Sequence, residues 1–137
     1  MTKVIPLAAM ARSEGFEFLD RLIEEWEDGT NRFEKPGEVI LGVWLGDELV
    51  GTGGLTVQRE NVARVRRVYV HPEHRKRGIA TLLMHSVLAR ARAHFAVAVL
   101  FTDTLEASTL YERLGFEPDN SDGPDHATHR MHFAKVA

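Results

Sequence analysis

Residues 68–80 of this chain read Val68-Tyr69-Val70-His71-Pro72-Glu73-His74-Arg75-Lys76-Arg77-Gly78-Ile79-Ala80. The stretch is typical of an apolar strand that stops, turns, and opens a helix through a basic corner containing a glycine. The first N–H groups of a helix have no intrahelical partner and carry the positive end of the helix dipole, so they attract an anion. We therefore expect the amides from Arg77 to Thr81 to bind phosphate, with charge added by Arg75, Lys76 and Arg77. A plain tight turn with a solvated basic corner is the structural alternative.

Three expected strands precede this corner. Residues 39–45 and 49–57 are joined at Gly46-Asp47-Glu48, a hairpin signal, and residues 62–70 follow a turn at Arg59-Glu60-Asn61. Such short connections predict an antiparallel meander. After the corner, residues 78–93 carry an apolar helical face, and residues 96–101 form the continuous apolar run of a strand buried on both faces. Strand, helix and strand predict a right-handed crossover between two parallel strands.

The third strand breaks its own alternation. Its apolar residues fall at 62, 65, 68 and 70, so the two-residue period fails before it returns at Val68 and Val70. A β-bulge inserts one residue and turns the following side chains over, which would produce this shift. An irregular, solvent-exposed strand start is the alternative.

The two ends of the chain complete the expected architecture. Residues 4–7 are predicted as a short first strand, residues 13–28 as an amphipathic helix ending at Asp28-Gly29, and residues 31–37 as a loop. Thr102, Asp103 or Thr104 is expected to cap a helix that Gly115 ends. A strand then begins at Phe116, residues 118–125 are a polar excursion, and residues 127–136 are the closing strand. These elements predict an α/β (α+β) fold.

Composition limits the class of protein. The 137 residues suit one domain, 1–137, and the net charge of −3 argues against a dedicated nucleic-acid binder, although the basic block at residues 64–77 keeps that option open. The absence of cysteine excludes disulfides, thiol catalysis and cysteine-ligated zinc. No apolar run approaches a membrane span and the start lacks a signal peptide, so a cytoplasmic location is the default expectation.

A second motif, Thr109-Leu110-Tyr111-Glu112-Arg113-Leu114-Gly115-Phe116, follows the pattern Arg75-x-x-Gly78-x-Ala80 by about thirty residues. Together, separated by one helix and one strand, the two motifs resemble the GNAT superfamily of acetyl-CoA-dependent acyltransferases. The resemblance implies one domain with a mixed central sheet, an antiparallel N-terminal meander, a β-α-β crossover, a splayed and bulged strand, and helices on both faces. It also implies acetyl-CoA as cosubstrate, and a homodimer is common in the family.

The resemblance assigns expected roles to individual residues. Pyrophosphate would bind at the turn formed by Arg75, Lys76, Arg77, Gly78, Ile79, Ala80 and Thr81. The pantetheine arm would pair with the strand backbone at Val68, Tyr69 and Val70. Many relatives place an Asn against the pantetheine seven residues before the motif's Tyr; here that position is Thr104, so the contact depends on a different side chain.

Tyr111 is the candidate general acid, since the resemblance places it against the thioester sulfur. A phenol with pKa near 10 can share its proton with a thiolate whose thiol pKa is about 8.5, particularly in a site that disfavours charge. Packing of Tyr111 in the core, with its hydroxyl at the rim, is the structural alternative.

The resemblance is weaker at the acceptor end. Many relatives carry a Glu in the bulged strand, six residues before the counterpart of Val70, and this chain has Arg64 there. No general base can be carried over, and Glu38, Glu60, His85 and His129 are weak candidates. Residues Trp26, Asn31, Arg32 and Phe33 lie where the family has its acceptor groove. We expect a small, partly apolar amine of depressed pKa, with a carboxylate for Arg32; core packing of the two aromatic residues is the alternative.

The histidines do not predict a metal site. His126, His129 and His132 are three residues apart, and odd offsets in a strand put neighbours on opposite faces. The leading hypothesis is a cytoplasmic N-acetyltransferase for a small amine or peptide. The alternatives are transfer of another acyl group or to a hydroxyl, a catalytically weak CoA-binding sensor or interaction module, and a nucleic-acid binder built on residues 64–77.

Overall fold

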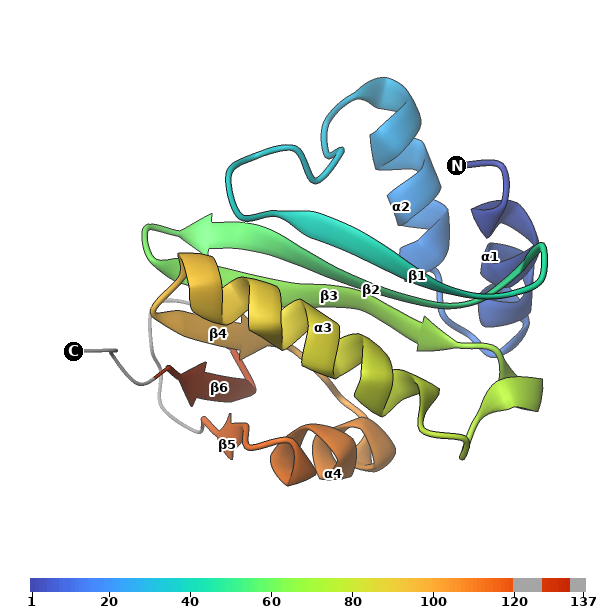
Figure 1. Ribbon diagram of the computed structural model, residues 1–137. Helices are drawn as coiled ribbons and strands as arrows, with labels where there is room; N and C mark the ends of the chain where they lie inside the picture. Colours follow the sequence, from blue (N-terminus) through green and yellow to red (C-terminus); the bar gives the residue numbers. More distant parts are fainter. Residues whose placement is uncertain (120–126, 134–137) are drawn as a thin grey trace.

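A computed structural model describes residues 1–119 and 127–133. Its strands form one six-stranded mixed sheet in the order β1-β2-β3-β4-β6-β5 (Figure 1). In chain order the elements are α1 (Val4–Ser13), α2 (Phe18–Asp28), β1 (Val39–Leu45), β2 (Glu48–Arg59), β3 (Val62–Val70), the 3-10 turn η1 (Pro72–His74), α3 (Ile79–His94), β4 (Val97–Leu100), α4 (Leu105–Arg113), β5 (Glu117–Pro118) and β6 (His129–His132).

The predicted meander and crossover are confirmed. β1 pairs antiparallel with β2, and β2 pairs antiparallel with β3. β3 and β4 are parallel and joined through α3, as a strand–helix–strand crossover requires. Thr104 caps α4 by accepting a hydrogen bond from the Ala107 amide, and Gly115 follows the helix with φ +106°.

Helices cover both faces of the sheet (Figure 1). On one face, α1 and α2 enclose a core that includes Leu7, Leu19 and Leu22, and the Tyr69 ring from β3 joins it. On the other face, α3 packs Met84 and Val87 against Leu55, Ala63 and Val65. Because Ala63 and Val65 face α3, the intervening residues of β3 face α2.

The prediction of a strand at residues 4–7 is wrong. Those residues begin α1, in which Val4, Leu7, Ala8 and Ala11 are buried at three- and four-residue spacing. The helix predicted from residue 13 starts at Phe18 instead, because the chain turns at Gly15 with φ +91°. The sequence therefore has two helices where one strand and one longer helix are expected from local pattern.

The predicted bulge in β3 is confirmed. Thr52 pairs with Tyr69 and Gly54 with Arg66, so two steps along β2 match three along β3. The extra residue is accommodated at Arg67, whose φ is +61° and whose carbonyl accepts a hydrogen bond from the Thr52 hydroxyl at 2.7 Å. The bulge places Arg66 and Arg67 on the same side of the strand, toward α2.

The strand predicted at Phe116 begins at Glu117, and the closing strand is the shorter β6. The polar excursion at residues 118–125 lies largely outside the described residues, as does the end of the closing strand. Within the described part of the chain, no helix has the length and apolar composition that crossing a membrane requires.

Candidate active site

The two central parallel strands diverge. β3 pairs with β4 only from Val62 to Arg64, which face Val97 to Val99, although β3 continues to Val70. His71 donates its N–H to the Val50 carbonyl at 2.8 Å, which makes Val70 and Gly51 a non-hydrogen-bonded pair. The N–H and carbonyl of Val70 therefore point away from β2, toward the opening between the diverging strands.

The corner before α3 presents unpaired amides, as the sequence predicts. Gly78 has φ +79°, no side chain caps the helix, and the first helical N–H to find a backbone partner is that of Leu82, which donates to Gly78 at 2.9 Å. Among the described residues, no group hydrogen-bonds the amides of residues 78–81. Lys76, with φ +63°, and Arg77 stand beside this terminus and have no carboxylate partner within the described chain. The geometry fits an anion at the helix terminus.

Arg75 is engaged elsewhere. Its guanidinium donates to both carboxylate oxygens of Glu14, at 2.9 and 2.7 Å, and its Nε donates to the Val70 carbonyl at 3.0 Å. The hydroxyl of Tyr69 also donates to Glu14. Hydrogen bonding to Arg75 is the main reason that the pKa of Glu14 lies below its usual value. Sequence reasoning placed Glu14 on an acidic helix face and missed its pairing with Arg75, because the partner is 61 residues away and local pattern gives no signal for such a pair.

Tyr111 lies in the last turn of α4 and is 8% exposed. Its ring packs edge-on against Phe116 at 5.9 Å between centroids, within the core shared with α3. Burial raises the pKa of the Tyr111 hydroxyl to about 12. No residue in the described ranges hydrogen-bonds this hydroxyl.

The loop after α2 supplies two of its four candidates to a cavity. Asn31 and Arg32 line a cavity of about 350 Å³, together with Arg66 from β3 and Glu38. Phe33 is 6% exposed and packs in the core. The backbone carbonyl of Trp26 accepts a hydrogen bond from Arg32 Nε at 2.8 Å and so contacts the loop. Trp26 and Phe33 do not line the cavity.

An arginine cluster lies on the α2 side of β3. It consists of Arg64, Arg66 and Arg67, whose Nε atoms are all buried without a hydrogen-bond partner within the described residues. Of the three, Arg67 alone makes an ion pair with a described residue, from Nη2 to Glu25 Oε1 at 2.8 Å. Sequence reasoning noted Arg64 as the start of the basic block at residues 64–77 and as the residue at the position of a missing Glu, but it did not group these three arginines on one face.

None of the four candidate general bases named from the sequence is an unpaired carboxylate at the opening between β3 and β4. Both carboxylate oxygens of Glu38 accept backbone N–H groups, from Lys35 at 3.1 Å and from Val57 at 2.8 Å. His129 is buried, with Nε2 at 3.5 Å from Glu112 Oε2. Glu60 and His85 are exposed on the surface.

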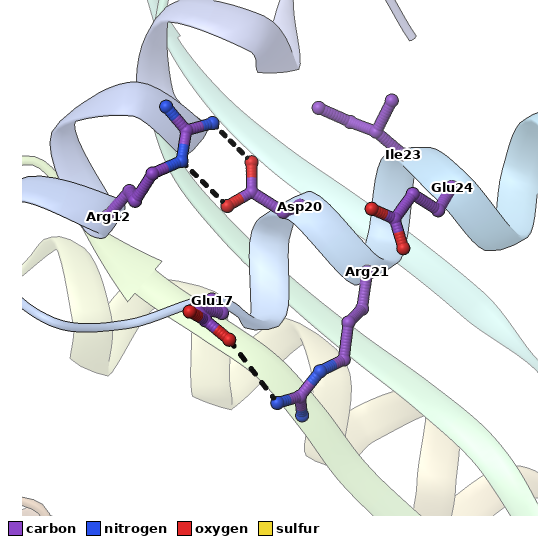
Figure 2. A pocket seen from close by; sticks show the side chains of 6 residues that line it. All are labelled: Arg12, Glu17, Asp20, Arg21, Ile23 and Glu24. Carbon is purple, nitrogen blue, oxygen red and sulfur yellow. Dashed lines mark hydrogen bonds and ion pairs between the residues drawn. The ribbon is translucent and has the colours of Figure 1, made fainter.

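A larger hollow of about 530 Å³ lies against α1 and α2 and holds charges that pair with one another (Figure 2). Arg12 donates to both oxygens of Asp20, at 3.0 and 2.5 Å, and Arg21 lies 4.0 Å from Glu17. Because these four side chains neutralise one another in pairs, they offer a ligand little unpaired charge.

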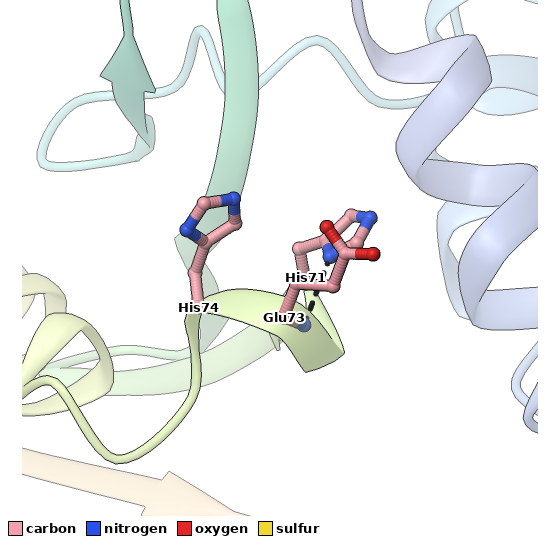
Figure 3. Close-up of side chains that lie close together, drawn as sticks. All are labelled: His71, Glu73 and His74. Atoms are coloured by element: carbon pink, nitrogen blue, oxygen red, sulfur yellow. Dashed lines mark hydrogen bonds between the residues drawn. The ribbon is translucent and has the colours of Figure 1, made fainter.

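Three potential metal ligands meet at η1, where atoms of His71, Glu73 and His74 lie within 4.8 Å of one another (Figure 3). His71 Nδ1 accepts the Glu73 amide at 3.1 Å, and His74 Nδ1 lies 3.5 Å from the Arg77 guanidinium. One ligand atom is thus occupied by the turn itself, and a cation stands beside another.

Comparison with known proteins agrees with this geometry. The model of the acetyltransferase (GNAT) family matches residues 6–116. A protein described as an acetyltransferase, from Exiguobacterium sp. 255-15, superposes with a TM-score of 0.81 at 25% identity, over 94% of this chain and 84% of that one. A search of curated proteins finds no match.

Two further solved structures share the fold. A protein from Bacillus anthracis described as a streptothricin acetyltransferase, in complex with acetyl coenzyme A, gives a TM-score of 0.60 at 20% identity, over 73% of this chain and 65% of that one. The PaiA N-acetyltransferase from Thermoplasma acidophilum, in complex with coenzyme A, gives 0.59 at 19% identity, over 85% and 70%. With the family model spanning most of the sequence, and the mixed sheet in agreement, this chain is an enzyme of the GNAT acetyltransferase family.

Proposed function

We propose that this protein is an N-acetyltransferase that moves the acetyl group of acetyl-CoA directly to the amine of a small molecule or peptide. The observation that carries the proposal is the opening between β3 and β4, next to the unpaired amides that begin α3. The B. anthracis and T. acidophilum proteins contain acetyl coenzyme A and coenzyme A, which supports the same cosubstrate here.

Backbone amides and side chains of this protein supply the contacts that we propose for acetyl-CoA. The amides of Gly78, Ile79, Ala80 and Thr81 bind the pyrophosphate, and Lys76 and Arg77 add charge. Hydrogen bonds to a charged partner are worth about 1.5–3 kcal/mol each. The β3 backbone at residues 68–70 receives the pantetheine arm, and Thr104, whose oxygen already accepts the Ala107 amide at 3.2 Å, can still donate its hydroxyl proton.

The reaction requires one new bond and one broken bond. The amine nitrogen bonds to the thioester carbonyl carbon, and the carbon–sulfur bond breaks. The Val70 N–H, which faces the opening, stabilises the charge on the carbonyl oxygen. Tyr111 donates its proton to the departing sulfur, the amine's surplus proton leaves to water, and the Tyr111 phenolate then regains a proton from water. Burial raises the pKa of Tyr111 because it disfavours an anion, and it disfavours a thiolate for the same reason, so the site opposes departure of the sulfur without a proton.

The acceptor amine must arrive neutral, since Arg64 stands where a base would be. At pH 7, removing the proton from an alkylamine with pKa near 10.4 costs roughly 4–5 kcal/mol of free energy. The same step costs only about 1 kcal/mol for an α-amino group with pKa near 8. We therefore propose an amine of depressed pKa, contacted by Asn31 and Arg32, whose loop Trp26 and Phe33 hold in place.

Calorimetric titration with CoA tests the binding site. Gly78→Glu should abolish binding, because it places a carboxylate at the phosphate position. Gly46→Glu is the matched control: both glycines have positive φ, +79° and +61°, and an added Cβ would meet nothing within 4 Å at either. Unchanged affinity in folded Gly78→Glu, or equal losses in both variants, would remove the assignment.

A further inference from the structure

The arginine cluster has more positive charge than the structure compensates. Three guanidinium groups share one face of β3, and within the described residues the only carboxylate bonded to them is Glu25, through Arg67. Burial, followed by repulsion from Arg67, lowers the pKa of Arg64, and burial with repulsion from both neighbours lowers that of Arg66 to about 10. Both side chains remain charged at neutral pH.

Of the three carboxylates that line the cavity with Arg66, Glu34 is exposed and the other two are already bonded. Glu25 binds Arg67, and Glu38 accepts two backbone amides. Arg64 and Arg66, in contrast, have no carboxylate bonded to them in the parts of the chain that the structure describes. The half-buried charge without a bonded carboxylate at this end of the 350 Å³ cavity is therefore positive, and a partly desolvated cation favours an anionic partner.

The position of the cluster fits the acceptor and not the cosubstrate. Arg64 is the last residue of β3 to pair with β4 before the strands diverge, and its guanidinium lies 4.5 Å from the centre of the Phe101 ring, just beyond β4. Arg66 lines the cavity on the α2 face. The pyrophosphate turn begins α3, which covers the opposite face.

We propose that the acceptor carries a carboxylate near its amine, and that Arg64 and Arg66 bind this carboxylate and orient the amine toward the opening between β3 and β4. The inference rests on the proposed function and narrows its substrate class to amino-carboxylates. A free amino acid and a peptide with an acidic N-terminal residue present the same chemistry, so the experiment includes both.

The test compares acceptors with and without a carboxylate near the amine, with rates expressed per neutral amine, because removing the carboxylate also lowers the pKa of the amine. Glycine with glycinamide, and Asp-Ala with Asn-Ala, are assayed for CoA release, and each compound is also titrated into the CoA-loaded protein. We expect the carboxylates to be preferred about 10- to 100-fold, the range that one or two charge-assisted hydrogen bonds supply. Preference for glycine alone identifies a free amino acid, and preference for Asp-Ala alone identifies a peptide. Amides that bind and react as well as their acids overturn the proposal.

Variants assign the preference to the cluster. Arg64→Gln and Arg66→Gln should each reduce kcat/KM for the carboxylate by about 10- to 100-fold, with little effect on the amide or on CoA affinity. Arg21→Gln, an exposed arginine of α2, is the control. Because removal of an uncompensated charge relieves repulsion, Arg66→Gln should also leave the thermal midpoint unchanged or raise it by about 2–4 °C. A lower midpoint with unchanged acceptor selectivity would make Arg66 structural.

Failure of this inference is distinct from failure of the proposed function. If the wild type binds CoA and acetylates amides as readily as acids, the acetyltransferase proposal stands and the carboxylate proposal falls. If no amine releases CoA and no carboxylate binds the CoA-loaded protein, both fall.

Discussion

The hydroxyl of Tyr111 makes no hydrogen bond that stabilises the described part of the fold. No described residue hydrogen-bonds it, and the ring packs through its carbon atoms against Phe116. Tyr111→Phe should therefore leave urea unfolding within about 0.5 kcal/mol of the wild type, while kcat falls about 10²- to 10⁴-fold with CoA affinity kept. Steady-state kinetics, with calorimetry as the control, measure the split. A decrease in kcat below about threefold would return Tyr111 to a packing role.

The pKa of Tyr111 also sets an expectation for pH. A general acid is active while protonated, so its contribution is lost only as pH rises through its pKa, which is about 12 here. We expect kcat to show no alkaline decline between about pH 7 and 10 in a stopped-flow or end-point assay of CoA release. A decline centred near pH 8 to 9 would require another acid.

The lowered pKa of Glu14 predicts a pH dependence of folding stability, because this carboxylate joins several elements of the fold. Its carboxylate links the end of α1 to β3 and to the turn before α3 through Tyr69 and Arg75. A carboxylate with a lowered pKa contributes stability above its unfolded pKa, near 4.3, and the contribution is lost as pH falls through the lower folded pKa. Glu14→Gln should thus cost about 1–2 kcal/mol at pH 7.

The pH dependence of that cost separates charge from packing. Denaturant unfolding of both proteins from pH 7 to 3 should show a constant difference down to about pH 5 and a shrinking one below about pH 4. A difference that stays constant to pH 3 would show that the charge of Glu14 is not what the network requires.

Within the described residues, a buried hydrogen bond from the Thr52 hydroxyl to the Arg67 carbonyl stands at the bulge in β3. Thr52→Val keeps the shape of the side chain and leaves that carbonyl unpaired, which should cost about 1–3 kcal/mol in urea unfolding. Thr109→Val is the control, because the Thr109 hydroxyl is exposed and bonds only to a carbonyl of its own helix. Equal costs in the two variants would argue against a special role for Thr52.

Local pattern predicted the elements whose signals are local. Broken alternation indicated the bulge, and short polar turns indicated the meander. At residues 4–7 the pattern misled, because four residues are too few to separate a strand period from a helical one, and the burial of Ala8 and Ala11 continues the helix. Whether Arg75 faces phosphate or Glu14 is decided by a contact between distant segments, which no local pattern contains.

At the scale of the whole molecule, the sheet is joined at its centre by a short parallel contact of three residue pairs. β1, β2 and β3 lie on one side of it, and β4, β6 and β5 on the other. A ligand that contacts both α3 and the opening should strengthen this connection. CoA at one hundred times its Kd is expected to stabilise the wild type by about 2.7 kcal/mol, measured as a shift of the thermal midpoint. Gly78→Glu should show no shift.

The alternation of β3 has a consequence for how this enzyme can change over evolutionary time. Ala63 and Val65 belong to the core shared with α3, whereas Arg64, Arg66 and Arg67 belong to the opposite face. A mutation at one of the three arginines can therefore alter which acceptor is chosen while the cosubstrate side keeps its packing. One strand thus carries two sets of residues that alternate in sequence and can mutate independently. Mutations of the arginine set can change the acceptor while the binding of acetyl-CoA is kept.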